Sequence, residues 1–243
     1  MTVVDAVAIH KAREFVITTL AQQLQAEFSA LYSRHQNAET GAFDPQATGR
    51  RRLKNLCLSY LGRLQNSEVQ HWATQQFYAA PTMTDSIGAL TVIVNSDHPA
   101  KQECLAHFYQ TWQNEALVVD KWFALQASSM ASDTFAVVQN LLHHPAFDLK
   151  NPNRVRSLIG AFSQANPLHF HALNGQGYAF LAEQIIALNA LNPQVASRML
   201  TPLTTWKRHD ATRQAMMRAQ LERVMTTPNI SRDVYEVASK SLA

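Results

Sequence analysis

The sequence has few of the residues that interrupt helices or cross-link small folds. Its 243 residues include 7 glycines, 9 prolines and 2 cysteines. So few glycines and prolines disfavour a turn-rich β-sandwich or barrel, and a hydrophobic content of 47% excludes a disordered polar chain. The two cysteines, Cys57 and Cys104, lie far apart within apolar helical patterns. We therefore expect two reduced thiols in the core of a mostly helical protein.

Charged residues and long apolar runs are also scarce. The chain has 21 Lys and Arg against 18 Asp and Glu, a net charge of +3 that is spread along the sequence and does not indicate a polyanionic partner. No apolar run approaches the roughly 20 residues that cross a bilayer, and the N-terminus lacks the pattern of a signal peptide. We expect a cytoplasmic protein that does not contact a membrane.

What the sequence does contain is a nearly unbroken series of amphipathic helical patterns. One long helix is predicted over residues 5–32, with Asp5 as its N-cap. The polar stretch 33–49 is rich in turn-forming residues and is predicted to be an exposed loop, and the apolar pattern resumes at Arg50. Further helices are predicted, with ends uncertain by about two to four residues, at 67–80, 83–95, 99–113, 115–130, 133–143, 152–164, 175–190, 193–205, 208–226 and 231–242.

Two of these helices begin with the same dipeptide, Asn151-Pro152 and Asn192-Pro193. Asn can cap a helix while Pro occupies its first position, where the missing N–H costs nothing. The two starts are 41 residues apart, close to the period of about 40 to 47 residues found in stacked two-helix repeats. The pattern predicts an all-α fold, a superhelical stack of antiparallel helix pairs of the HEAT/armadillo kind, forming one helical-repeat domain over residues 1–243. An irregular helical bundle is the competing arrangement.

Catalytic and metal-binding motifs are missing from the sequence. It has no HExxH zinc motif, no phosphate-binding glycine loop, no GxSxG and no CxxC. The paired histidines are His143 with His144 and His169 with His171, and neither pair has a cysteine or carboxylate at ligand spacing. We expect no catalytic residue and no metal site in this chain.

The densest basic run comprises Arg50, Arg51, Arg52 and Lys54. It is predicted to begin a helix, where positive charge opposes the helix dipole. A solvated face or an interdomain contact is a better explanation than a nucleic-acid patch, which would need aromatic residues among the basic ones.

The most informative polar residues lie near the two Asn-Pro helix starts. Arg154 and Arg156 fall in the first turns of one helix, while Gln194 and Arg198 share a face of the other because they are four residues apart. If the two helices are equivalent members of successive repeats, Arg156, Gln194 and Arg198 converge on one hollow suited to carboxylates or peptide carbonyls. The alternative is that the arginines bind carbonyl groups of neighbouring repeats.

Several long strings of this region are characteristic of a known family. They are NPNRVRSLIGAF at 151–162, GYAFLAEQI, NPQVASRML and TPLTTWKRHD, with TMTDSIGAL and DKWFALQA upstream and ISRDVYEVASKSLA at the end. Together they resemble the C-terminal helical domain of the bacterial aminopeptidase N family, whose members are zinc-dependent gluzincins. The resemblance covers most of the chain from about residue 82 onward and is looser before it.

The resemblance implies an accessory role for this chain. In that family a separate catalytic domain carries the zinc and the HExxH motif, and a superhelix of HEAT-like pairs caps its active site and limits access to peptides. By resemblance, Gln194 lies against the pocket for the first side chain of the substrate, and Arg156 and Arg198 face the internal cavity. The implied partners are the catalytic domain of the same parent chain and peptide substrates, so the fragment alone is expected to hold no zinc and to be inactive. The alternative is a free-standing helical-repeat scaffold that binds a protein or a nucleic acid on its concave face.

Overall fold

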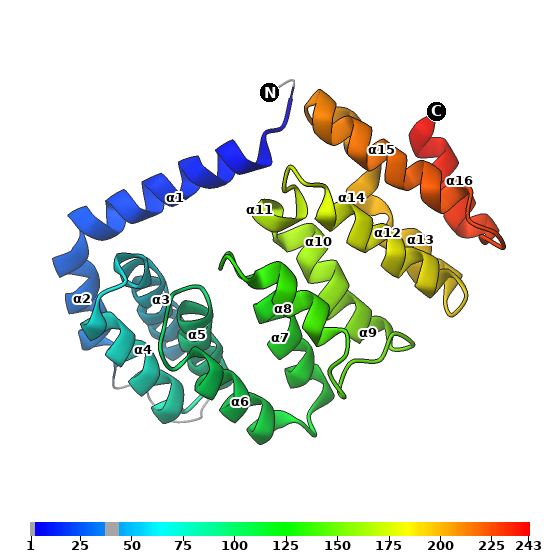
Figure 1. Ribbon diagram of the computed structural model, residues 1–243. Helices are drawn as coiled ribbons and strands as arrows, with labels where there is room; N and C mark the ends of the chain where they lie inside the picture. Colours follow the sequence, from blue (N-terminus) through cyan, green and yellow to red (C-terminus); the bar gives the residue numbers. More distant parts are fainter. Residues whose placement is uncertain (1–2, 37–43) are drawn as a thin grey trace. The chain divides into compact units, whose positions relative to one another are not determined.

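The computed structural model describes residues 3–36 and 44–243, and all regular structure within these ranges is helical (Figure 1). The all-α prediction is therefore confirmed. The chain forms two compact units, a larger one made of Met1–His10 with Asn114–Ala243 and a smaller one made of Lys11–Gln113. The prediction of one helical-repeat domain over residues 1–243 stays a prediction. No helix in the described ranges is long and apolar enough to cross a membrane.

The smaller unit is held together by packing between neighbouring helices. Helix α3 packs against α2 and α5, and α4 packs against α5. The elements of this part of the chain are α1 (Ala6–Gln23), whose first residues belong to the larger unit, α2 (Gln25–Arg34), α3 (Pro45–Leu61), η1 (Gly62–Leu64), α4 (Ser67–Ala79), α5 (Met83–Val94) and α6 (Lys101–Trp112).

The single long helix predicted over residues 5–32 is wrong. The Asp5 cap is present, since its carboxylate accepts the N–H groups of Val7 and Ala8 at 3.1 and 3.0 Å, but the helix breaks at Leu24. The break redirects α2 along α3, and the ring of Phe28 stacks on Tyr60 with 4.8 Å between centroids. Packing decides this bend, because no proline or glycine marks it in the sequence.

The predicted exposed loop over residues 33–49 is also too long. Ser33 and Arg34 still belong to α2, and α3 begins at Pro45, five residues before the predicted start at Arg50. Asp44 is the N-cap, with its carboxylate accepting the N–H groups of the next two non-proline residues at 3.0 Å each. The Asp-Pro pair is thus a helix start rather than a turn. Residues 37–43 of the predicted loop lie outside the described ranges.

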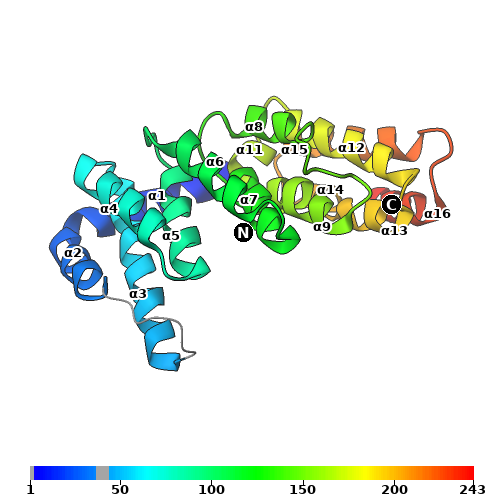
Figure 2. The same cartoon turned by 90° about the horizontal axis from the view of Figure 1, so that it is seen from below.

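The larger unit contains stacked helix pairs. The hairpin of α12 and α13 packs on the hairpin of α15 and α16, with α12 against α15 and α13 against α16, and Figure 2 shows the two resulting layers. The elements are α7 (Ala116–Ala127), α8 (Thr134–Leu141), α9 (Pro152–Val155), η2 (Arg156–Gly160), α10 (Ala161–Ala165), α11 (Pro167–Phe170), α12 (Gln176–Asn189), α13 (Pro193–Met199), α14 (Thr201–Thr204), η3 (Trp206–Arg208), α15 (Ala211–Met225) and α16 (Arg232–Leu242).

Both Asn-Pro helix starts are confirmed. The Asn151 side chain accepts the N–H of Asn153 at 2.9 Å, and that of Asn192 accepts the N–H of Val195 at 3.1 Å. Helix α4 is capped by Asn66, whose side chain accepts the N–H of Val69 at 2.8 Å. The predicted helix over 152–164 contains a five-residue π-helical stretch, η2. These caps fix where the helices that carry the candidate site begin.

Candidate functional site

Arg156 stands at the first position of the π-helical stretch η2. The four residues that follow it are buried, and η2 packs against α7. The Arg156 side chain remains exposed, with Nη1 donating to Oδ1 of Asn153 at 3.2 Å. A π-helical turn widens the helix locally, and such turns often occur at functional sites. The buried side of η2 therefore anchors an exposed guanidinium.

Gln194 and Arg198 lie on the exposed face of α13. The intervening Val195 and Ala196 are buried, as helical spacing requires, while both polar side chains are exposed. No described residue makes a hydrogen bond or ion pair with the Arg198 guanidinium or the Gln194 carboxamide. Both side chains thus lie on the exposed face of α13, which agrees with the prediction that they share one face.

The side chain of Met199, at the end of α13, lies close to the stretch η2 at Gly160. A Cβ atom at Gly160 would lie 3.7 Å from Cε of Met199 and 3.8 Å from Cβ of Arg156. Met199 directly follows Arg198, so the α13 end that carries Arg198 packs beside the turn that carries Arg156. This close approach is the observation that connects the two helices. It does not establish that the three predicted residues face one hollow, which stays a prediction.

Arg154 has a structural role instead. Its side chain is buried, with Nε donating to the Ala146 carbonyl at 2.9 Å and Nη1 donating to the Ala116 carbonyl at 2.9 Å. Nη1 also forms an ion pair with the Asp120 carboxylate. The alternative considered for the arginines, carbonyl binding between neighbouring elements, therefore holds for Arg154. Arg156, two residues later, makes no such contact.

The histidine pairs form hydrogen bonds within the fold. His144 Nδ1 accepts the N–H of Ala146 at 3.2 Å, and His171 Nδ1 lies 2.9 Å from the Tyr178 hydroxyl. Burial and the neighbouring His209 and Arg213 lower the pKa of His171 to about 4. Within residues 3–36 and 44–243 no three His, Cys, Asp or Glu side chains gather as metal ligands do.

The basic run at Arg50 does not begin a helix, contrary to the prediction. It lies inside α3 rather than at a helix start, because the helix begins at Pro45. Arg50 Nη2 lies 3.5 Å from the Asp44 carboxylate, and Arg51 donates to Thr48 Oγ1 at 3.1 Å. Lys54 points inward and is 3% exposed. One of the four cations is therefore unavailable to a polyanion.

The two cysteines are buried and free, as predicted.

The stacked helix pairs define the class of the protein, an α-helical repeat domain. The whole chain, residues 1–243, matches the family model described as "Domain of unknown function (DUF3458_C) ARM repeats". The chain belongs to this family. The match confirms the prediction of a helical-repeat stack.

Two of its relatives are longer proteins. The chain is 41% identical over 241 residues to aminopeptidase N of Escherichia coli, with 99% of this chain and 28% of the relative covered. It is 39% identical over 238 residues to aminopeptidase N of Caulobacter vibrioides, covering 98% and 28%. The chain therefore spans a little more than a quarter of the curated relatives that it matches.

A solved structure gives the same result for the fold. The chain superposes with a TM-score of 0.91 and 31% identity on Legionella pneumophila aminopeptidase A in complex with aspartic acid, covering 100% of this chain and 29% of that one. The resemblance to the C-terminal domain of aminopeptidase N is thereby confirmed.

Sequence patterns located the Asn-Pro helix starts, whereas the π-helical turn under Arg156 left no signal in the sequence.

Proposed function

We propose that this chain is the accessory domain of a zinc aminopeptidase that removes N-terminal residues from peptides. The domain forms part of the wall of the substrate chamber and restricts access to it, while the zinc and the catalytic residues belong to another part of the parent chain. The observation that carries the proposal is the similarity over 98–99% of this chain to a segment of aminopeptidase N chains.

Arg156, Gln194 and Arg198 are proposed to face the peptide. All three are exposed, and the Met199 contact at Gly160 joins the helices that carry them. Guanidinium groups bind carboxylates and carbonyl oxygens through directed N–H donors, and a glutamine side chain offers both a donor and an acceptor. These are the groups that the backbone and the C-terminus of a short peptide present. A domain that limits which peptides enter the substrate chamber by enclosing it needs no catalytic residue of its own.

The surface also supports a partner within the same parent chain. Three large apolar side chains are strongly exposed, Phe15 at 72%, Leu117 at 70% and Leu173 at 64%. Apolar side chains favour contact with another protein surface where they form one contiguous patch. We propose that the remaining part of the aminopeptidase covers some of these three side chains. The two free buried thiols agree with a reducing compartment, and we propose the cytoplasm as the location.

The proposal is tested with a chimera of Escherichia coli aminopeptidase N in which the matched segment is replaced by this chain. The chimera is expected to hydrolyse N-terminal residues from peptides and amino-acid anilides, whereas the 243-residue chain alone is expected to bind no stoichiometric zinc and to be inactive. Hydrolysis by the purified chain, free of other proteases, would contradict the proposal. A folded chimera without activity would also contradict it.

Variants of the chimera test the three residues separately. Arg156→Ala, Gln194→Ala and Arg198→Ala are each expected to raise KM for tripeptides about tenfold, as expected for loss of a charge-assisted or neutral hydrogen bond in a buried complex. The matched control is Arg218→Ala, which removes an arginine whose side chain is 58% exposed and pairs with Glu222 on its own helix. Equal KM values for all four variants would mean that Arg156, Gln194 and Arg198 do not bind the peptide.

A further inference from the structure

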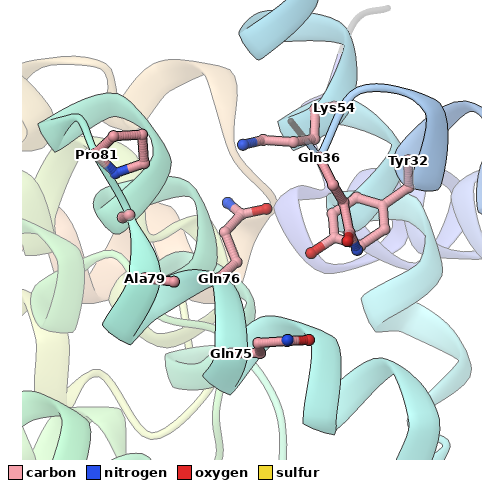
Figure 3. Close-up of a pocket in the computed structure, with 8 residues that line it drawn as sticks. Tyr32, Gln36, Lys54, Gln75, Gln76, Ala79 and Pro81 are labelled. Carbon is pink, nitrogen blue, oxygen red and sulfur yellow. The ribbon is translucent and has the colours of Figure 1, made fainter. Parts of the chain in front are cut away.

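A half-open cavity of about 120 Å³ with mixed polar and apolar walls lies within the smaller unit, lined by residues of α2, α3 and α4, by Gln36 and by the turn after α4. Lys54, Gln76 and Tyr32 supply its polar wall, and Ala79 and Pro81 supply apolar surface (Figure 3). A single water needs roughly 10–15 Å³ of such space. The cavity therefore has room for a ligand of several heavy atoms. It is separate from the proposed peptide site at Arg156, Gln194 and Arg198.

Hydrogen bonds at the cavity floor fix the orientation of the Gln76 carboxamide. The Asp85 carboxylate accepts an N–H from Asn55 at 2.8 Å, which turns Oδ1 of Asn55 toward Gln76. Nε2 of Gln76 then donates to that Oδ1 at 2.7 Å and to the Asp85 backbone carbonyl at 2.9 Å. Both partners are acceptors, so the amide nitrogen must face them. Oε1 of Gln76 is thereby held on the opposite side.

Oε1 of Gln76 is a buried acceptor without a donor. The residue is 9% exposed, and no described residue donates to Oε1. Figure 3 shows this oxygen directed toward Gln36 and Tyr32, across the cavity. Buried polar atoms in folded proteins are nearly always paired with protein, water or ligand. The cavity is thus built to receive an N–H or O–H donor at this oxygen.

Lys54 supplies the complementary donor without adding net charge. Its Nζ lies 3.0 Å from Oδ2 of Asp85, and both side chains are almost completely buried. The ammonium has three N–H donors, and among the described residues the Asp85 carboxylate is its one ion-pair partner. Because the pair is neutral overall, the cavity offers nothing to offset the desolvation of a charged ligand. A neutral ligand with an acceptor and a donor on neighbouring atoms fits best.

We propose that this cavity binds a small primary carboxamide. The amide NH₂ donates to Oε1 of Gln76, the amide carbonyl accepts from Nζ of Lys54, and the alkyl part packs on Ala79 and Pro81. This site is independent of the function proposed above, because it rests on residues of the smaller unit only.

The test is a titration of the 243-residue chain followed by NMR of the glutamine side-chain amides. Three small probes are compared: propionamide, sodium propionate, which has the same number of heavy atoms but is charged, and 1-propanol, which is neutral but lacks the carbonyl. Propionamide is expected to shift the Gln76 amide signals with a Kd on the order of 10 mM, which five heavy atoms can provide. Propionate and propanol are expected to bind at least tenfold more weakly. Equal binding of the three, or binding of none, would show a water-filled cavity and overturn the proposal.

Variants separate recognition from folding. Gln76→Leu removes the acceptor and is expected to weaken propionamide binding at least tenfold. Ala79→Leu fills the cavity from its apolar side without touching the Asn55 network and is expected to have the same effect, so a failure of Gln76→Leu to fold leaves the test intact. Gln46→Leu, at an exposed glutamine of α3, is the control. Unchanged binding by a folded Gln76→Leu or Ala79→Leu variant would overturn the proposal.

Discussion

Nζ of Lys54 lies 3.0 Å from Oδ2 of Asp85, and the two side chains are 4% and 0% exposed. Removing one member of a buried ion pair leaves an uncompensated charge, which costs about 3–5 kcal/mol. We predict that Lys54→Met lowers the free energy of unfolding of the chain by this amount. The measurement is urea denaturation followed by circular dichroism at neutral pH.

The double variant Lys54→Met with Asp85→Leu separates the ion pair from ordinary packing. Its loss of stability is expected to be smaller than the sum of the two single losses by more than about 1 kcal/mol, because no charge is left buried alone. Additive losses would mean that the two charges do not interact.

Two glycines in helices should respond in opposite ways to alanine. A Cβ at Gly177 would lie 2.4 Å from the backbone carbonyl oxygen of Phe170, so α12 can approach α11 only without a side chain at this position. Gly177→Ala is predicted to lower the free energy of unfolding by more than about 2 kcal/mol, since the clash is with backbone. Gly49→Ala in α3 is the control, because nothing lies within 4 Å of its Cβ position. It is expected to stabilise the chain by about 0.5–1 kcal/mol. Equal thermal shifts for the two variants would contradict the prediction.

The helix starts could be read from the sequence because a cap depends on residues a few positions apart. Asn151 and Asn192 each accept an N–H from within the next three residues, so the signal is local. The burial of Lys54 could not be read in this way, because its partner Asp85 comes from another helix. For the same reason Arg154 and Arg156 look alike in sequence, although Asp120 on α7 pairs with Arg154. Long-range partners decide which polar residues are structural and which are left for a ligand.

Histidine burial predicts acid sensitivity in the larger unit. The rings of His171 and His209 lie 4.5 Å apart, and Arg213 Nε donates to the His171 carbonyl at 2.8 Å. Burial, assisted by His209 and Arg213, lowers the pKa of His171 to about 4, and burial also lowers the pKa of His209. Below the histidine pKa of the unfolded chain, about 6.5, His171 binds a proton in the unfolded state but not in the native state. Stability is therefore expected to fall as the pH drops from about 6.5 to about 4, by up to about 3 kcal/mol for His171.

The measurement is the free energy of unfolding in urea at pH 7, 6, 5 and 4. His171→Gln should give a shallower decline than the unmodified chain over this range, even if its stability at pH 7 is lower. A variant with the same slope as the unmodified chain would assign the acid sensitivity to other groups.

Arg154 and Arg156 are two residues apart, but their alanine variants are predicted to differ in folding stability. Arg154→Ala removes the donors to the carbonyls of Ala116 and Ala146 and leaves Asp120 without its ion-pair partner, at a site where the arginine is 8% exposed. Its loss should cost about 3–5 kcal/mol of folding free energy, because a charge and two carbonyls lose their partners together. Arg156→Ala removes one exposed hydrogen bond to Asn153 and should change stability by less than about 0.5 kcal/mol. Chemical denaturation of both variants distinguishes the roles, and a large loss for Arg156→Ala would mean that this residue supports the fold and would weaken its place in the proposed peptide site.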